Sequence, residues 1–383
     1  MRRSLSFAIV LALSAGLVLP ASGFALNKVS APSPRTYTVL VGWENPHQGI
    51  GIMAYFPDAV TIHVGDTVRW VQNANEIHTV TFLAGAEPAP LIVTAADAGV
   101  PPSPSPLLFN PVAVNPAIPA GGLYDGTTYA NSGLMGREPG QVKEFRLNFT
   151  AEGTYEYLCL VHSIMMSGRV MVVASDIALP SPNKAAAEGP KQIARGLAQV
   201  PAVVRDAAAQ IQPPVANPDG TTTHHVLIGY AAGQIELMQF FPDRLTVRPG
   251  DTVVWEMSPQ NDAPHTVTFL NKEPEPPLVI PVPQPGAPPL LYANPAVFFP
   301  QQPSPDLTRS GIYNSGVMNP IPGTTHTQVL GDLKPGLEPW ICLLHDSSGM
   351  KGTLMVVPRP TQPPHLAPVR SGRGMALPPR DSR

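Results

Sequence analysis

The sequence predicts an all-β protein with two tandem β-sandwich domains, and three observations support this prediction. A series of short motifs occurs twice, in the same order, along the 383 residues. In each copy, β-branched residues alternate with polar ones over short segments that end at turn residues, as in sandwich strands. Proline is frequent, with 49 residues, and because it lacks an N–H donor it favours irregular connections over long helices.

The repeat defines the two domains, which we place at residues 36–175 and 223–358. Five pairs of segments match in order: 56–70 with 241–255, 77–83 with 264–270, 107–111 with 290–295, 131–135 with 314–318, and Cys159 and His162 with Cys342 and His345. The spacing between copies stays nearly constant, so we interpret the chain as a duplicated domain. A chain of this length also exceeds one ordinary core.

Each copy contains segments with the alternation expected of strands. In the first copy they are 59–70, 79–82 and 153–159, and in the second 244–255, 266–269 and 352–357. The two longest segments each contain a Gly-Asp pair, which predicts a turn between two strands.

The N-terminal 25 residues, 1–25, predict an export signal peptide. Arg2 and Arg3 give a positively charged start, residues 5–19 are almost wholly apolar, and small residues follow. We therefore expect a periplasmic or extracellular protein. The alternative is an uncleaved membrane anchor, although the apolar run is short for a helix that spans a bilayer.

The segments outside the domains differ in composition. Residues 176–222 are expected to form an Ala/Pro-rich, partly helical linker, with one or two helical turns broken at Pro190 and Pro201. Residues 359–383 are rich in Pro, Arg and Gly and are expected to be a disordered tail.

Each domain also contains a long proline-rich stretch, at 87–119 and at 273–305. We expect little regular structure there, since proline disrupts helices and central strands. Loops of this length usually carry a function. They could cover a site, pack the two domains together or form a docking surface, and the sequence leaves these alternatives open.

The chemistry lies in a constellation that occurs once in each copy: a histidine on one strand, then Cys-x-x-His, followed closely by methionine. A thiolate, two imidazoles and a weak axial thioether form the set that selects copper and suits electron transfer. We therefore expect two type 1 copper ions, one per domain. The predicted ligands are His78, Cys159, His162 and Met166 in the first domain, with Met165 as the alternative to Met166, and His265, Cys342, His345 and Met350 in the second.

In these residues both copies resemble the plastocyanin–azurin family of cupredoxins. A proline precedes His265, and residues 342–352 read Cys-x2-His-x4-Met-x-Gly, with the plastocyanin spacing. In the first copy, Met166 begins the family's Met-x-Gly and leaves a loop spacing seen in azurins, whereas Met165 would match the loop of amicyanins.

The resemblance implies a Greek-key cupredoxin β-sandwich in each domain and one-electron transfer as the activity. It also implies that the histidine after the cysteine, His162 or His345, exposes its ring edge where redox partner proteins dock. No nucleic acid is expected as a partner, because charged residues make up only 13% of the chain and the net charge is −3. A membrane is expected as a partner only if the signal segment stays uncleaved.

The sequence departs from plastocyanin at two pairs of positions. Leu158 and Ile341 stand where plastocyanins have a tyrosine before the cysteine, so electron entry through that residue is not expected here. Thr79 and Thr266 replace the asparagine that usually follows the first histidine ligand and ties the ligand loops together. We expect a threonine hydroxyl to replace that tie only in part.

Other interpretations of the same residues are weaker. The two cysteines could form a disulfide, the usual fate of a cysteine pair in an exported protein, but they stand at equivalent places in separate domains. The remaining histidines mostly lack a counterpart in the other copy and are not expected to bind metal; they are His47, His63, His224, His225, His326 and His365.

Two other functions use a similar site. A copper delivery protein would bind the ion without redox duty, although such carriers often use open sites rich in methionine or histidine. A two-domain copper oxidoreductase of the nitrite reductase or laccase type needs His-x-His pairs for further copper and a histidine directly after the cysteine. The chain has no His-x-His, and Leu160 and Leu343 follow the cysteines, so we expect an electron carrier and not an enzyme.

Overall fold

The computed structural model describes residues 33–137 and 141–359, and the chain from Pro34 onward forms one compact unit that contains both copies of the repeat. The predicted signal peptide lies outside the described residues, as does the predicted tail after Arg359, which includes His365. Among the described helices, none combines the length and the apolar character needed to cross a bilayer.

The first copy consists mostly of strands. Its elements are β1 (Thr36–Asn45), β2 (Ile50–Phe56), β3 (Ala59–His63), β4 (Thr67–Gln72), β5 (Thr81–Phe82), β6 (Ile92–Thr94), β7 (Leu107–Phe109), α1 (Pro111–Val114), the 3-10 turn η1 (Ala120–Gly122), β8 (Leu123–Tyr124), β9 (Ala130–Asn131), β10 (Glu144–Phe149), β11 (Gly153–Cys159) and β12 (Ser163–Val173). The predicted turn at Gly65 and Asp66 separates β3 from β4.

Three helices lead to the second copy: α2 (Pro182–Ala186), α3 (Glu188–Leu197) and α4 (Val200–Ala208). The second copy contains β13 (Val215–Ala216), β14 (Thr222–Ala232), β15 (Ile235–Phe241), β16 (Arg244–Val247), β17 (Thr252–Met257), β18 (Thr268–Phe269), β19 (Val279–Gln284), β20 (Ala287–Ala293), α5 (Pro295–Phe298), β21 (Tyr313–Asn314), β22 (Thr325–Val329), β23 (Gly336–Ile341) and β24 (Lys351–Val356).

Each copy is a sandwich of two sheets. In the first, β2-β1-β4-β10-β8 packs on β3-β12-β11-β5-β9, and in the second, β15-β14-β17-β22 packs on β16-β24-β23-β18-β21. Trp70 of β4 contacts Tyr157 of β11 with ring centroids 5.3 Å apart, and Trp255 of β17 contacts Trp340 of β23 at 5.8 Å. Buried residues alternate along β4 and β17, which places the core between the sheets. The predicted tandem β-sandwich fold is confirmed.

The two sandwiches share one sheet. β2 pairs with β15 in antiparallel orientation, with Ile52 opposite Ile235 and Gly51 opposite Glu236, so this sheet extends through both copies with ten strands. The paired strands occupy equivalent places in the repeat, each at the edge of the sheet in its own copy. The pairing therefore leaves neither of these sheet edges open.

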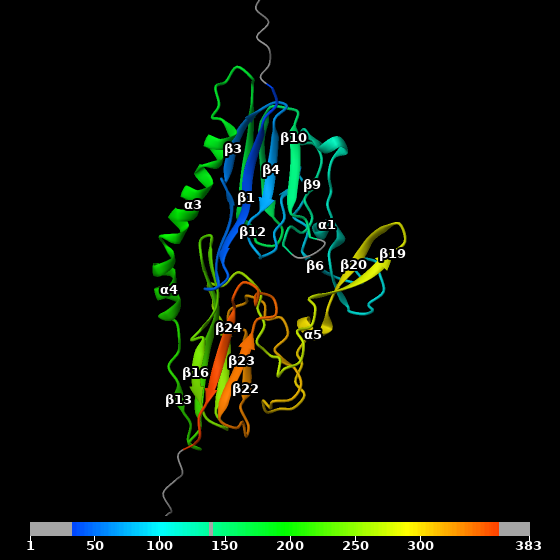
Figure 1. The fold of residues 1–383 in the computed structure, drawn as a ribbon. Coiled ribbons are helices and arrows are strands. Elements are labelled where there is room, and N and C mark those ends of the chain that lie inside the picture. The colour runs from blue at the N-terminus through cyan, green and yellow to red at the C-terminus, as the bar shows by residue number, and fades with distance from the viewer. Residues whose placement is uncertain (1–32, 138–140, 360–383) are drawn as a thin grey trace, which may run out of the picture. The chain divides into compact units, whose positions relative to one another are not determined.

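The proline-rich stretches join the copies a second time. Contrary to the expectation of little regular structure, they form a four-stranded sheet in the order β19-β20-β7-β6 (Figure 1). Tyr292 of β20 lies opposite Leu108 of β7, and its hydroxyl donates to the Pro101 carbonyl at 2.8 Å. Prolines fit in β19 because it is an edge strand, where a missing N–H need not interrupt a ladder.

The linker is more helical than the sequence predicts. Pro190 and Pro201 lie in the first turns of α3 and α4 and do not break these helices, because first-turn N–H groups have no intrahelical acceptor. Ile193 of α3 packs in a cluster with Ile52 of β2, and Val203 of α4 belongs to a cluster with residues of β14 and β15. The two helices run along one side of the sheets (Figure 1).

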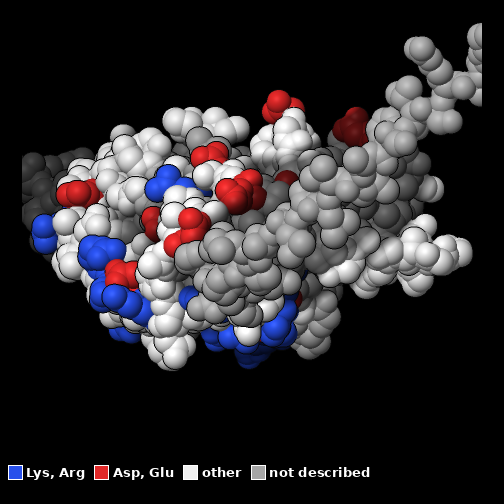
Figure 2. Space-filling view, turned by 90° about the horizontal axis from the view of Figure 1, so that it is seen from above, with Lys and Arg blue, Asp and Glu red and all other residues white. Residues whose placement is uncertain are grey.

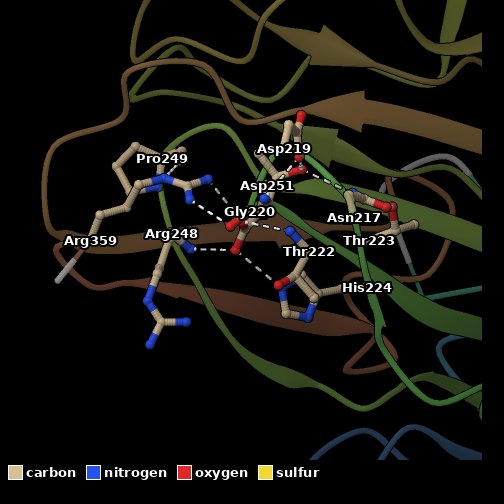
Figure 3. Close-up of polar contacts among 11 residues, drawn as sticks. Asn217, Asp219, Gly220, Thr222, Thr223, His224, Arg248, Pro249, Asp251 and Arg359 are labelled. Atoms are coloured by element: carbon tan, nitrogen blue, oxygen red, sulfur yellow. Dashed lines mark hydrogen bonds and ion pairs between the residues drawn. The ribbon is translucent and has the colours of Figure 1, made fainter. Parts of the chain in front are cut away.

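A buried aspartate, Asp251, organises the turn between β16 and β17 (Figure 3). Its carboxylate accepts the N–H groups of Thr222 at 3.0 Å and Arg248 at 2.8 Å, and lies 3.3 Å from Arg359 Nη2. Arg359 also donates to the Gly220 carbonyl at 2.9 Å. The first residue of the predicted tail is thus attached to the second copy, contrary to the expectation of disorder at that position.

The face of the molecule in Figure 2 carries both signs of charge. Basic side chains gather toward one margin and acidic ones lie nearer the middle, so neither sign covers this face.

Candidate metal centre

The structure brings the first set of predicted ligands together. His78 Nδ1 lies 3.2 Å from His162 Nδ1, and Cys159 Sγ lies 3.6 Å from His162 Nδ1 and 4.0 Å from His78 Nδ1. Cys159 ends β11, His162 stands in the turn that follows, and His78 precedes β5, which pairs with β11. The three donor atoms lie within 4.8 Å of one another, so a single ion can contact all three.

The second set has the same arrangement. His265 Nδ1 lies 3.0 Å from His345 Nδ1, and Cys342 Sγ lies 3.7 Å and 3.5 Å from these two atoms. Cys159 and Cys342 are both buried free thiols, one in each set, so the structure does not support the disulfide alternative.

The methionines near the two sets differ in burial. Met166 and Met350 are fully buried, whereas Met165 is 39% exposed. A buried thioether suits a buried donor set, so Met166 is the better candidate for the axial position of the first site.

The repeated Asn-Ser-Gly segment, whose role the sequence did not reveal, positions the first histidine of each set. The backbone N–H of His78 donates to the Met135 carbonyl at 2.9 Å, and that of Met135 donates back at 2.7 Å. His265 and Met318 repeat this exchange at 3.0 and 2.8 Å. Ser132, three residues before Met135, accepts the Val80 N–H at 2.8 Å, so the segment holds both His78 and the residue two positions after it.

The threonine after each first histidine ties the ligand segments together. Thr79 N–H donates to Cys159 Sγ at 3.3 Å, and Thr79 Oγ1 accepts the N–H of Leu160 at 2.8 Å. Thr266 makes the same pair of bonds in the second copy, at 3.3 and 2.8 Å. One threonine thus bonds both the sulfur and the residue that follows it, which is the tie that the sequence analysis expected threonine to provide in part.

Two glycines make room for the first histidine of each set, and the sequence analysis missed both. Gly42 has a φ of +69°, and a Cβ there would lie 2.3 Å from His78 Nε2. Gly229 has a φ of +63°, and its Cβ would lie 2.6 Å from His265 Nε2. Each glycine stands at a register shift in its strand. The sequence contains a signal for them, since each glycine lies between an aliphatic and an aromatic residue inside a strand, a pattern that indicates a β-bulge.

The two sites differ behind this first histidine. His265 Nε2 lies 3.3 Å from Asn261 Oδ1, whereas His78 Nε2 is buried and has no hydrogen-bond partner among the described residues. Ala74 takes the corresponding place in the first copy, since a Cβ on Gly42 would meet both Ala74 and His78.

Burial sets the protonation of the donor atoms. Burial lowers the pKa of His162 to about 3, with the charge of His345 as a further cause, and lowers the pKa of His345 to about 4. The pKa values of His78 and His265 fall well below the usual range, again chiefly through burial, so all four imidazoles are neutral and keep a lone pair for a metal. Burial raises the pKa of the Cys342 thiol to about 11, so a binding metal ion displaces its proton.

The other described histidines have different neighbours. His63 Nε2 lies 2.8 Å from the Ile177 carbonyl oxygen, and the ring of His326 lies 5.9 Å from that of Trp255. Among the described residues, only the two predicted sets group three His, Cys, Asp or Glu donors at metal spacing.

Comparison with known proteins gives one family match. A family model described as copper binding proteins of the plastocyanin/azurin family matches residues 44–173. No curated protein matches the chain.

Solved amicyanin structures match part of the chain. An oxidised amicyanin variant is 20% identical, with 36% of this chain and 82% of that chain covered and a TM-score of 0.21. Amicyanin from Paracoccus versutus (Thiobacillus versutus) is 19% identical, with 36% and 81% covered and a TM-score of 0.20.

The matched range contains the whole first ligand set, from His78 to Met166. The second copy repeats its order along the chain, its sandwich fold and its donor geometry. The first copy is therefore of the cupredoxin type, because residues 44–173 match the model of the plastocyanin/azurin copper-binding family, and the second copy shares its fold and donor geometry.

Proposed function

We propose that this chain is an exported type 1 copper protein that transfers single electrons through two sites. The observation that carries the proposal is the double occurrence of one donor set, two imidazole nitrogens and one cysteine sulfur within 4.8 Å. One-electron transfer is the activity that the resemblance to cupredoxins implies.

The residues present fit copper. Thiolate sulfur with two imidazoles and a thioether is the donor set of blue-copper electron-transfer sites. The N–H groups of Thr79 and Thr266 point at the sulfurs at 3.3 Å, and such donors favour the thiolate form. Bound copper supplies a reversible change between Cu(II) and Cu(I), and the protein holds the ligands so that little rearrangement accompanies it.

Burial favours electron transfer over copper delivery. His78, Cys159 and Met166 have no exposed surface, and neither have Cys342 and Met350. In copper delivery, ligands of a partner protein must reach the ion and replace its own ligands. An electron, in contrast, can cross the protein that encloses a buried site. The enclosed sets therefore support the carrier function.

Export rests on residues 1–25. We expect N-terminal sequencing of the protein from producing cells to begin after residue 25. A mature chain that still begins at Met1 would show that the segment is retained.

Redox partner proteins are proposed to dock at His162 alone. The sequence analysis named both His162 and His345 as docking points. His162 is partly exposed, but His345 is 5% exposed and lies against the first copy. A partner protein needs access to the ring edge, and burial removes that access at His345.

Cys159→Ala and Cys342→Ala test the two-site assignment. Each change removes the sulfur ligand of one site, so each variant is expected to lose about half of the thiolate-to-copper absorption and to hold about one copper per chain instead of about two. Copper counting, visible absorption and electron paramagnetic resonance measure these quantities. His326→Gln, outside both sets, is the control and is expected to keep both coppers. A cysteine variant that loses all of the absorption, or none, contradicts the assignment.

A further inference from the structure

The ligand loop of the second site, residues 342–350, is docked on the first copy. The Ser348 hydroxyl donates to Glu44 Oε2 at 3.1 Å, and Asn75 Nδ2 donates to the Ser347 carbonyl at 3.4 Å. Polar groups of the first copy thus bind the loop that carries three of the four predicted ligands of the second site.

Gly349 shows how closely this loop approaches the first copy. Its φ is +97°, and a Cβ there would lie 2.0 Å from the Pro46 carbonyl oxygen. Only glycine fits such an approach. The backbones of the two copies therefore meet directly beside Met350.

The same region holds Glu76 in place. Glu44 accepts the N–H groups of Asn75 at 2.6 Å and Glu76 at 3.3 Å, and Gln72 Nε2 donates to the Glu76 carbonyl at 2.7 Å. Glu76 is only 9% exposed. Its side chain is therefore enclosed in the contact between the copies.

The Glu76 carboxyl group meets the outer edge of a predicted ligand of the other site. Glu76 Oε2 lies 3.7 Å from His345 Nε2, while Nδ1 of the same ring lies 3.5 Å from Cys342 Sγ. One nitrogen of this imidazole thus belongs to the second site and the other faces the first copy. In a cupredoxin of one domain, that outer edge would face solvent or a partner.

The connection continues to the first site along the chain. Glu76 stands two residues before His78, whose Nδ1 lies 3.2 Å from His162 Nδ1. The chain from Glu76 to His78 leads to the first site, and His345 is a predicted ligand of the second. The 3.7 Å contact between Glu76 and His345 is the one non-covalent step on this route between the two sites.

We propose that Glu76 is a positioning residue that couples the two sites, holding the His345 ring edge against the first copy so that electrons pass between the sites inside the chain. This inference rests on the proposed electron-transfer function. One electron leaves the reduced site and enters the oxidised site, and no bond forms or breaks. An external donor and acceptor, which are partner proteins or small redox reagents, supply and remove the electron.

Two variants of Glu76 test the coupling. Glu76→Ala removes the link, and Glu76→Gln keeps its shape in case the smaller side chain disturbs folding. Glu188→Gln, which changes an exposed carboxyl paired with Lys191 on α3, is the control. Pulse radiolysis that delivers less than one electron per chain, followed at different protein concentrations, separates transfer within a chain from transfer between chains. Cys159→Ala and Cys342→Ala supply the reference spectrum of each single site.

We expect a phase in the wild type whose rate does not depend on protein concentration. Glu76→Ala is expected to slow this phase by about tenfold or more, corresponding to about 1.4 kcal/mol in the barrier. Glu76→Gln is expected to slow it less, and Glu188→Gln is expected to leave it unchanged. An unchanged rate in Glu76→Ala overturns the proposal.

A second measurement does not depend on electron transfer. In the reduced, copper-loaded protein, the His345 Nε2–H is expected to exchange slowly with water, and Glu76→Ala is expected to speed this exchange by about tenfold or more. Nuclear magnetic resonance of the imidazole N–H measures it. A wild type without two reversible redox sites contradicts the proposed function. Two reversible sites with unchanged transfer and exchange rates in Glu76→Ala contradict only the coupling.

Discussion

The two sites have the same kinds of donor atom but differ in the residue next to the Nε2 atom of the first histidine. A ligand histidine whose second ring N–H donates to a fixed acceptor has its tautomer and ring orientation set before metal arrives. Asn261 provides that acceptor for His265, and Ala74 cannot provide it for His78. The second site is therefore better organised than the first.

Asn261→Ala is expected to lower the copper affinity of the second site by about 10- to 100-fold, the usual cost of losing such a support. The first site, unchanged in the same chain, is the internal control. Competition with a chelator of known affinity, followed by the absorption of each site, gives both constants. Equal affinities of the second site before and after the change would show that Asn261 does not support His265.

At the scale of the element, β15 carries an acid at the point where the two copies join. Glu236 is 2% exposed, lies opposite Gly51 of β2, and its Oε1 has no hydrogen-bond partner among the described residues. Burial raises the pKa of this carboxyl well above its usual range, and the charges of Asp262 and Glu76 raise it further. Glu236 is therefore protonated in the folded protein at a pH where the unfolded chain has released the proton.

This difference makes stability depend on pH. Above the ordinary glutamate pKa the unfolded chain gains from ionisation and the folded chain does not, so the free energy of unfolding falls as pH rises toward the raised pKa. Glu236→Gln removes this effect. The variant is expected to be more stable than the wild type at pH 8 by about 1 kcal/mol or more, with a difference that shrinks toward pH 4.

Denaturant titration of the copper-free protein across this pH range measures the effect. Glu144→Gln is the control, because Glu144 is exposed and its pKa is lowered, chiefly by its hydrogen bond to Arg146. A stability difference for Glu236→Gln that stays constant with pH would mean that the buried carboxyl is ionised in the folded state.

At the scale of the whole molecule, the two copies are joined by continuous structure. The sheet shared through β2 and β15, the sheet of β19, β20, β7 and β6, and the docked loop 342–350 each connect them. One cluster of buried apolar residues also includes members of both copies, such as Met53 and Met238. Neither copy can unfold without exposing a strand edge and apolar surface of the other.

We therefore expect the chain to unfold in one cooperative transition. Scanning calorimetry is expected to give equal calorimetric and van't Hoff enthalpies. Copper in either site is expected to raise the Tm of the whole chain, because it binds the folded state alone. Two separate transitions, of which only one moves when Cys342→Ala removes the second copper, would show that the copies are thermodynamically independent.

Sequence analysis predicted the sandwich strands and the donor residues for a physical reason. Strand alternation is a local property of the chain, and a Cys-x-x-His next to methionine places three donors on one loop whatever surrounds it. The Gly-Asp turn at Gly65 and Asp66 is local in the same sense. His78, which is distant from Cys159 in the sequence, could be assigned to the first ligand set because the second copy repeats it as His265.

The sequence by itself thus determined the fold class, the duplication and the six His and Cys donors that meet in two sets. Tertiary structure alone decided what surrounds them: that β2 meets β15, that His345 faces Glu76 instead of solvent, and that Asn261 supports one histidine only. These contacts join residues far apart in the chain, and they depend on which sheet edges and loops find complementary surfaces when the copies pack. No local pattern encodes that choice, because the same strands and ligands would satisfy two separate domains equally well.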